Sequence, residues 1–207
     1  MNTSGNPSAG EARTPAIILI AVALVVSVAL NVVLAHRVRN VMRAHRIETS
    51  ERLLRVGAIA PPIAAKDLGG QRELISYYDS RQPTVLYIFT PTCSWCARNM
   101  DNLKTLVEEE SGPYRFIGIS LSEEGLAEYI KKNDLKLPIY SGLSNETKQA
   151  YKLSGTPQTI VISPESKVLQ DWMGAYVGDQ KSQVEAFFHV SLPGLKPAPS
   201  SQLTGGE

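Results

Sequence analysis

The chain has 207 residues and a formal net charge of +1, because 21 lysines and arginines oppose 20 aspartates and glutamates. This balance argues against a nucleic-acid-binding protein, which needs a basic surface to hold phosphates. The chain has two cysteines and three histidines (His36, His45 and His189), and no histidine is near the cysteines in sequence. Because a structural zinc site needs four such ligands, we expect no metal site. The balanced charge leads us to expect no nucleic-acid partner.

The N-terminal part contains one long uncharged segment. Residues 1–14 are small and polar and are predicted to be disordered. The predicted transmembrane anchor covers residues 15–35, and the twenty residues 16–35 carry no charge. As a helix they would span about 30 Å, the thickness of the hydrocarbon core. A signal peptide has a shorter apolar region of about 7–15 residues, although Val33-Leu34-Ala35 offers a weak cleavage site. A buried core helix fits poorly between flanking arginines.

Two arguments about the orientation of the anchor conflict. One arginine precedes the apolar segment and four follow it, so the positive-inside rule places the C-terminal domain in the cytoplasm. A redox dithiol, by contrast, is useful where disulfides form, which is outside the cytoplasm. The arginines that flank the apolar segment are Arg13, Arg37, Arg39, Arg43 and Arg46.

Residues 36–55 contain few helix breakers and are predicted to form a helical stalk.

Residues 56–191 form one predicted globular domain, and residues 192–207, a Pro/Gly/Ser-rich stretch, form a predicted disordered tail. The hydrophobic patterns predict an alternation of strands and helices that ends in a hairpin and a helix. This order is typical of an α/β sandwich with one mixed sheet. The predicted strands are 85–89, 114–120, 136–140, 159–162 and 167–173, and the predicted helices follow residue 93 up to a stop at 111–113 and cover 123–132, 145–152 and 179–189.

The tetrapeptide Cys93-Ser94-Trp95-Cys96 joins the first of these strands to the following helix. A Cys-x-x-Cys at a strand-to-helix junction is typical of a redox dithiol. At a helix N-terminus, free backbone N–H groups and the helix dipole stabilise a thiolate, which is the nucleophile in disulfide exchange. Cys96 shares a helical face with Met100 and Leu103 and is therefore predicted to be buried. The alternatives are half of a zinc site or two inert buried cysteines.

Further motifs at matching distances resemble the membrane-anchored TlpA/ResA-like redoxins of the AhpC/TSA-related superfamily. They are the opening 56–62, the segment 67–70 with Leu74, the run 155–162 and the segment 167–174. The resemblance covers about residues 54–190. It implies a thioredoxin-like three-layer sandwich behind one transmembrane helix, and a thiol–disulfide oxidoreductase acting in the reductase direction. It also implies that the domain is extracytoplasmic, against the arginine count.

The resemblance assigns roles to individual residues. Cys93 would be the exposed attacking thiol and Cys96 the buried resolving thiol, with their disulfide as the redox centre and no other cofactor. Pro157 would be a cis-proline whose loop, with Thr156, faces the dithiol and pairs with an extended substrate segment. Trp95 would lie beside this site, either shielding the sulfurs or capping the core. The implied partners are protein disulfides or dithiols, such as apocytochrome cysteines or a misoxidised secreted protein, and a membrane electron donor.

Several positions depart from the family pattern. Tyr87 replaces the buried aspartate that thioredoxins carry six residues before the first cysteine, and Ser94-Trp95 lacks the glutamate of some relatives. No proton acceptor for Cys96 is therefore evident. Thr92 replaces a tryptophan and is a candidate helix cap. Because Asp101 replaces the usual proline, the helix kink of the family is expected to be missing.

Two other functions on the same fold stay open. A peroxiredoxin-like peroxidase needs a Pro-x-x-x-Thr-x-x-Cys run, and Thr90 supplies the threonine, but Leu86 stands in the place of the proline. A non-catalytic copper-delivering module needs a histidine near the cysteines in space. Only His189 lies in the predicted globular domain, near its C-terminal end.

Overall fold

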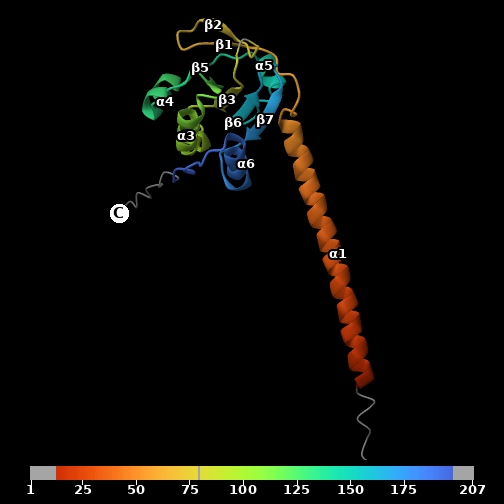
Figure 1. Cartoon of the computed structure of the whole chain (residues 1–207). Coiled ribbons are helices and arrows are strands. Elements are labelled where there is room, and N and C mark those ends of the chain that lie inside the picture. The colour runs from red at the N-terminus through yellow and green to blue at the C-terminus, as the bar shows by residue number, and fades with distance from the viewer. Residues whose placement is uncertain (1–12, 79, 198–207) are drawn as a thin grey trace, which may run out of the picture. The chain divides into compact units, whose positions relative to one another are not determined.

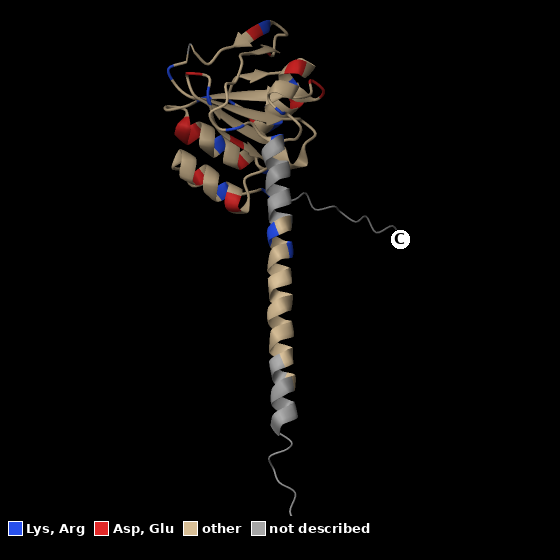
Figure 2. Cartoon of the chain, turned by 90° about the vertical axis from the view of Figure 1, so that its right-hand side faces the viewer, with Lys and Arg blue, Asp and Glu red and all other residues tan. Residues whose placement is uncertain are grey.

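The computed structural model describes residues 13–78 and 80–197 and divides into an N-terminal unit ending at Thr49 and a globular unit beginning at Ser50. Helix α1 (Arg13–Arg52), shown in Figure 1, supplies all of the described residues of the first unit, and its last three residues belong to the second. Within it, Val22–Asn40 is long and apolar enough to cross a membrane. Figure 2 shows that this helix carries a long run without charged side chains. The span overlaps the predicted segment 16–35.

A five-stranded mixed sheet forms the centre of the globular unit, with the strand order β5-β4-β3-β6-β7. The central strand β3 pairs in parallel with β4 and antiparallel with β6, so the sheet is mixed, as the sequence pattern predicted. The strands are β3 (Thr84–Phe89), β4 (Arg115–Ser120), β5 (Ile139–Tyr140), β6 (Gln158–Ile162) and β7 (Val168–Met173), and the helices are α2 (Ser94–Arg98), α3 (Met100–Glu110), α4 (Leu126–Asn133), α5 (Asn145–Ala150) and α6 (Gly178–Phe188).

Both faces of the sheet are covered, which makes a three-layer arrangement. All six residues of β3 are buried, and alternate side chains point to opposite faces. Leu86 and Ile88 belong to a core cluster that includes Tyr151 at the end of α5. Val85 packs in a second cluster with residues of α3 and α6, and Tyr87 packs in a third with residues of α2, α3 and α4. In Figure 1, α3 and α6 accordingly lie on the same side of the sheet.

A small antiparallel hairpin, β1 (Ile63–Lys66) and β2 (Arg72–Ile75), precedes the main sheet and was not predicted from the sequence. Lys66 exchanges two backbone hydrogen bonds of 2.8 Å with Ser141, which follows β5. Ile63 and Ile75 are buried in the first core cluster. The hairpin therefore packs against the face of the sheet opposite to α3.

The prediction that residues 192–207 form a disordered tail is wrong for residues 192–197; residues 198–207, like residues 1–12, lie outside the described part. Leu192 is 3% exposed and packs in the cluster formed with α3 and α6. The Gly194 N–H donates to Asn102 Oδ1 at 2.8 Å. Lys196 and Arg98 form two hydrogen bonds, one between their backbones and one from the Arg98 guanidinium. These partners lie far back in the sequence, so composition alone could not reveal the packing.

Candidate active site

The two cysteines form a disulfide at the N-terminus of α2, directly after the carboxyl end of β3. Cys93 is the N-cap residue, and its sulfur accepts a hydrogen bond from the backbone N–H of Cys96 at 3.0 Å. Thr92, the cap candidate from the sequence, is not the cap. Cys93 is half-buried, whereas Cys96 is fully buried. The backbone N–H aimed at Cys93 stabilises a thiolate there when the disulfide is reduced.

The loop before β6 faces the dithiol from the other side. The Thr156–Pro157 peptide bond is cis. The carbonyl oxygen of Thr156 lies 3.5 Å from the sulfur of Cys93, so a reduced Cys93 thiol can donate to it. Pro157 is buried, and its carbonyl accepts a hydrogen bond of 2.7 Å from the Gly174 N–H after β7. The structure thus brings together Cys93, Cys96, Thr156 and Pro157.

Trp95 lies on the surface beside the dithiol. Its side chain is 49% exposed, and the guanidinium carbon of Arg98 lies 4.6 Å from the ring centroid. About half of the residue's surface is therefore accessible to solvent or to a substrate. The ring and the stacked guanidinium present an amphipathic surface next to Cys93.

The helix that follows the dithiol is interrupted, although Asp101 replaces the family proline. The expectation of an unkinked helix is therefore wrong: α2 ends at Arg98, and α3 begins at Met100. Asn99, at the junction, is fully buried. Its Oδ1 accepts hydrogen bonds from the Tyr176 N–H at 3.0 Å and from the Asn102 amide at 2.9 Å. Sequence reasoning missed Asn99, and its only signal was a weak helix former within an apolar periodic segment.

Tyr87 lies in β3 beneath the helix that carries the cysteines and is 1% exposed. Burial raises the pKa of Tyr87 well above its usual value, Tyr176 raises it further, and the Asn99 amide partly offsets the increase. The hydroxyl is therefore a neutral donor at any physiological pH. It cannot act as the proton-accepting carboxylate of thioredoxins.

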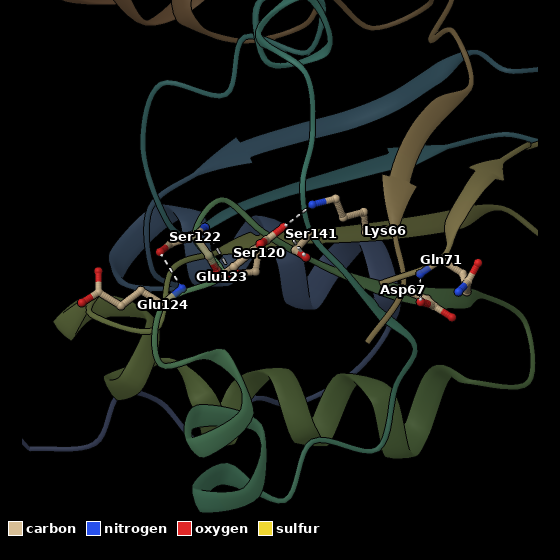
Figure 3. Close-up of polar contacts among 8 residues, drawn as sticks. All are labelled: Lys66, Asp67, Gln71, Ser120, Ser122, Glu123, Glu124 and Ser141. Atoms are coloured by element: carbon tan, nitrogen blue, oxygen red, sulfur yellow. Dashed lines mark hydrogen bonds and ion pairs between the residues drawn. The ribbon is translucent and has the colours of Figure 1, made fainter. Parts of the chain in front are cut away.

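A cavity of about 460 Å³ lies between the β1–β2 hairpin and the start of α4. Its polar side is formed by Lys66 and Glu123, whose charged groups are 3.3 Å apart, with Ser141 Oγ at 3.5 Å from the same carboxylate oxygen (Figure 3). Leu126 supplies part of its apolar wall. A Cβ atom added to Gly125 would lie only 3.8 Å from Pro91, two residues before Cys93. Gly125, which lies in sequence between the lining residues Glu123 and Leu126, is therefore close to the loop that precedes the dithiol.

Within residues 13–78 and 80–197, no three His, Cys, Asp or Glu side chains are grouped closely enough to hold a metal ion. His189 is exposed and forms the C-cap of α6.

Comparisons with known proteins agree with this geometry. The AhpC/TSA family model matches residues 56–170. The thiol-disulfide oxidoreductase ResA of Bacillus thuringiensis is 26% identical over 150 residues, which cover 70% of this chain and 83% of that protein.

Solved structures share the fold. The thioredoxin domain of a thiol-disulfide oxidoreductase from Bacteroides vulgatus superposes with a TM-score of 0.53 at 23% identity, covering 65% of this chain and 99% of that one. A thiol:disulfide interchange protein from Bacteroides sp. gives a TM-score of 0.52 at 22% identity, covering 68% and 93%. The globular unit has a thioredoxin-like α/β fold with a mixed sheet, and the chain belongs to the AhpC/TSA family.

Proposed function

We propose that the protein is a membrane-tethered thiol–disulfide oxidoreductase that exchanges disulfides with protein substrates. The observation that carries this proposal is the position of the Cys93 sulfur, half-exposed between the Cys96 N–H and the Thr156 carbonyl. The name of the Bacillus relative, a thiol-disulfide oxidoreductase, supports the same activity.

In the reductase direction the Cys93 thiolate attacks one sulfur of a substrate disulfide, and the other substrate sulfur leaves as a thiolate. The Cys96 thiolate then attacks the Cys93 sulfur of the mixed disulfide, which forms the Cys93–Cys96 disulfide and releases the second substrate thiolate. The substrate gains two electrons and the protein loses them. A membrane dithiol donor then has to reduce the disulfide again.

The substrate is a protein segment in extended form. The Thr156 carbonyl faces Cys93, and the backbone of Gly155-Thr156-Pro157 can pair with such a segment beside the sulfur. Trp95, which is exposed two residues after Cys93, can give the segment an apolar contact. This arrangement recognises an unfolded or flexible chain around a cysteine.

We propose that α1 anchors the protein through residues 16–35, with the globular unit outside the cytoplasm. The uncharged run of α1 supports the anchor. The redox dithiol supports this orientation, because disulfides form outside the cytoplasm. Reporter domains that are active on only one side of the membrane, fused after residue 197 so that the packed segment 192–197 is kept, test this. Activity of an extracytoplasmic reporter is expected, and activity of a cytoplasmic reporter alone would show that the arginines set the topology.

Three assays on the full-length protein in detergent separate this function from the alternatives. Insulin reduction with a dithiol donor should be fast for the wild type and lost in Cys93→Ser. Peroxide consumption at a comparable rate would favour the peroxidase instead. That alternative is disfavoured because Leu86, in the place of the required proline, is buried within β3. Stoichiometric copper binding without insulin reduction would identify a copper-delivering module.

A further inference from the structure

The side chain of Arg98 is held in place by a part of the chain that is remote in sequence. Its backbone carbonyl accepts the Lys196 N–H at 2.9 Å, and its Nε donates to the Lys196 carbonyl at 3.0 Å. The segment around Lys196 is itself fixed, because Leu192 is buried in the cluster formed with α3 and α6 and the Gly194 N–H donates to Asn102. The fold therefore orients the guanidinium, which is not a freely rotating surface group.

In this position the guanidinium lies over the exposed ring of Trp95. Its carbon is 4.6 Å from the ring centroid, and Trp95 is 49% exposed two residues after Cys93. Arg98 follows Cys93 by five positions, which is about 7–8 Å along a helix. An extended chain spans that distance with about two to three residues. A substrate segment that is joined to Cys93 and runs along α2 therefore reaches Arg98 within three residues.

The guanidinium keeps free donors and a positive charge. In the described part of the chain the Lys196 carbonyl is the only hydrogen-bond acceptor of this side chain, and it uses Nε and leaves both terminal nitrogens. Asp101, the nearest following carboxylate in sequence, is paired with Lys196 Nζ at 2.9 Å and not with Arg98. Residues 93–100 contain no acidic side chain that could neutralise the charge.

These features suit a carboxylate ligand. The terminal nitrogens of a guanidinium form a planar fork that matches the two oxygens of an aspartate or glutamate side chain. The Trp95 ring attracts the cation and shields one face of it from water. The other donors of the fork point away from the acceptor that the protein itself supplies.

We propose that Arg98 and Trp95 form an acidic-residue subsite, which selects substrate segments that carry an aspartate or glutamate within three residues of the cysteine. The inference rests on the proposed function, because it specifies which protein disulfides are exchanged. Arg98 takes no part in the transfer of electrons. It binds the substrate carboxylate while Cys93 attacks the substrate sulfur, and the segment 192–197 supports it.

Peptides whose single cysteine is joined to 2-thiopyridine test the proposal on the full-length reduced protein in detergent. Cys93 attacks the peptide sulfur and forms the mixed disulfide, and the leaving group, uncharged thiopyridone, is followed by absorbance. One peptide series carries two aspartates, asparagines or lysines at the second and third positions before the cysteine, and the other series carries them after it. Each rate is divided by the rate of mercaptoethanol with the same peptide, which removes the intrinsic effect of the charges on the disulfide.

In the series whose chain runs along α2, the wild type should react about three- to fivefold faster with the aspartate peptide than with the asparagine peptide, as expected of a half-exposed ion pair. The lysine peptide should react most slowly, and high salt should reduce the differences. Equal rates with the aspartate and asparagine peptides in both series would overturn the subsite. This comparison needs no variant of the protein.

Arg98→Met removes the charge and keeps an unbranched side chain. It should abolish the preference for aspartate and leave the rate with the asparagine peptide unchanged. Arg98→Lys should keep only part of the preference, because lysine has no planar fork. Arg72→Met is the matched control: it makes the same substitution at an exposed position of β2 and should keep the wild-type preference.

A purely structural role of Arg98 predicts a different result. If Arg98 only held the segment 192–197, Arg98→Met would lower the melting temperature without changing the ratio of the aspartate and asparagine rates, and that outcome would also overturn the subsite. Because any accessible thiol releases thiopyridone, the ratio can be read without reductase activity. Failure of insulin reduction with an intact aspartate preference would therefore reject the proposed function and leave the subsite standing.

Discussion

The carbonyl oxygen of Thr156 lies 3.5 Å from the sulfur of Cys93, although 63 residues separate the two in sequence. On its other side the same sulfur accepts the Cys96 N–H at 3.0 Å. Cys93 therefore has one backbone donor that stabilises its thiolate and one backbone acceptor that holds its thiol. Cys96, fully buried one helical turn later, has neither solvent nor a described carboxylate partner. This asymmetry gives the two cysteines different chemistry.

The two thiols should react with alkylating reagents at very different rates. In Cys96→Ser the remaining Cys93 should be alkylated by iodoacetamide roughly tenfold faster at pH 7 than an unperturbed thiol, because the helix N-terminus lowers its pKa. In Cys93→Ser the remaining Cys96 should react slowly until the protein is unfolded. Labelling rates followed by mass spectrometry across pH test this, and faster labelling of Cys96 in the folded protein would reverse the assigned roles.

The C-terminal segment 192–197 should contribute to stability. Leu192→Ala should lower the free energy of unfolding by about 2–5 kcal/mol, because a buried leucine leaves a cavity in the cluster between α3 and α6. Denaturant unfolding followed by tryptophan fluorescence measures the change. Ser191→Ala, at an exposed neighbouring position, is the control and should change the value by less than about 0.5 kcal/mol. A Leu192→Ala protein as stable as this control would show that the packing of residues 192–197 does not contribute to stability.

Local patterns account for the parts of the site that were predicted correctly. The apolar run 85–89 is strand β3, and the Cys-x-x-Cys begins a helix as its position indicated. The approach of Thr156 and Pro157 to the dithiol, by contrast, was expected only from the family resemblance, and it occurs because β6 pairs with β3. The predicted ends of elements shifted by a few residues. For example, α4 begins only after Gly125, which has a φ of +68°.

The parts that were missed depend on partners remote in sequence. The break at Asn99 is stabilised by the Tyr176 N–H, 77 residues later, and the packing of the tail depends on Asn102, 92 residues before Gly194. No local pattern encodes either contact. The β1–β2 hairpin has strands of only four residues, and one of them is mostly exposed, so its hydrophobic alternation is too weak to recognise.

Asp171 should make stability depend on pH in the acidic range. It is 7% exposed, and burial raises its pKa above the ordinary value of 3.8, although hydrogen bonds from the Leu54 N–H and the Gln158 amide lower it. The folded protein thus binds this proton more tightly than the unfolded chain. The contribution of Asp171 to stability therefore falls as the pH rises from 3.8 through the folded pKa.

The comparison with Asp171→Asn isolates this contribution. The free energy of unfolding of the wild type minus that of the variant should decrease through this window and stay constant above it. Unfolding measured at a series of pH values supplies both curves. Glu109→Gln, which alters an exposed carboxylate, is the control and should keep the wild-type dependence. A constant difference between wild type and Asp171→Asn would show that the buried carboxyl does not titrate differently on folding.

The central claim is that Cys93 attacks a substrate disulfide and Cys96 resolves the product. The most direct test mixes reduced protein with a disulfide-linked peptide and identifies the products by mass spectrometry. Cys96→Ala should accumulate one peptide half bound to Cys93, whereas the wild type should release both peptide thiols and form the Cys93–Cys96 disulfide. Peptide bound to Cys96 in Cys93→Ala at a comparable rate, or no transfer to either cysteine, would contradict the account.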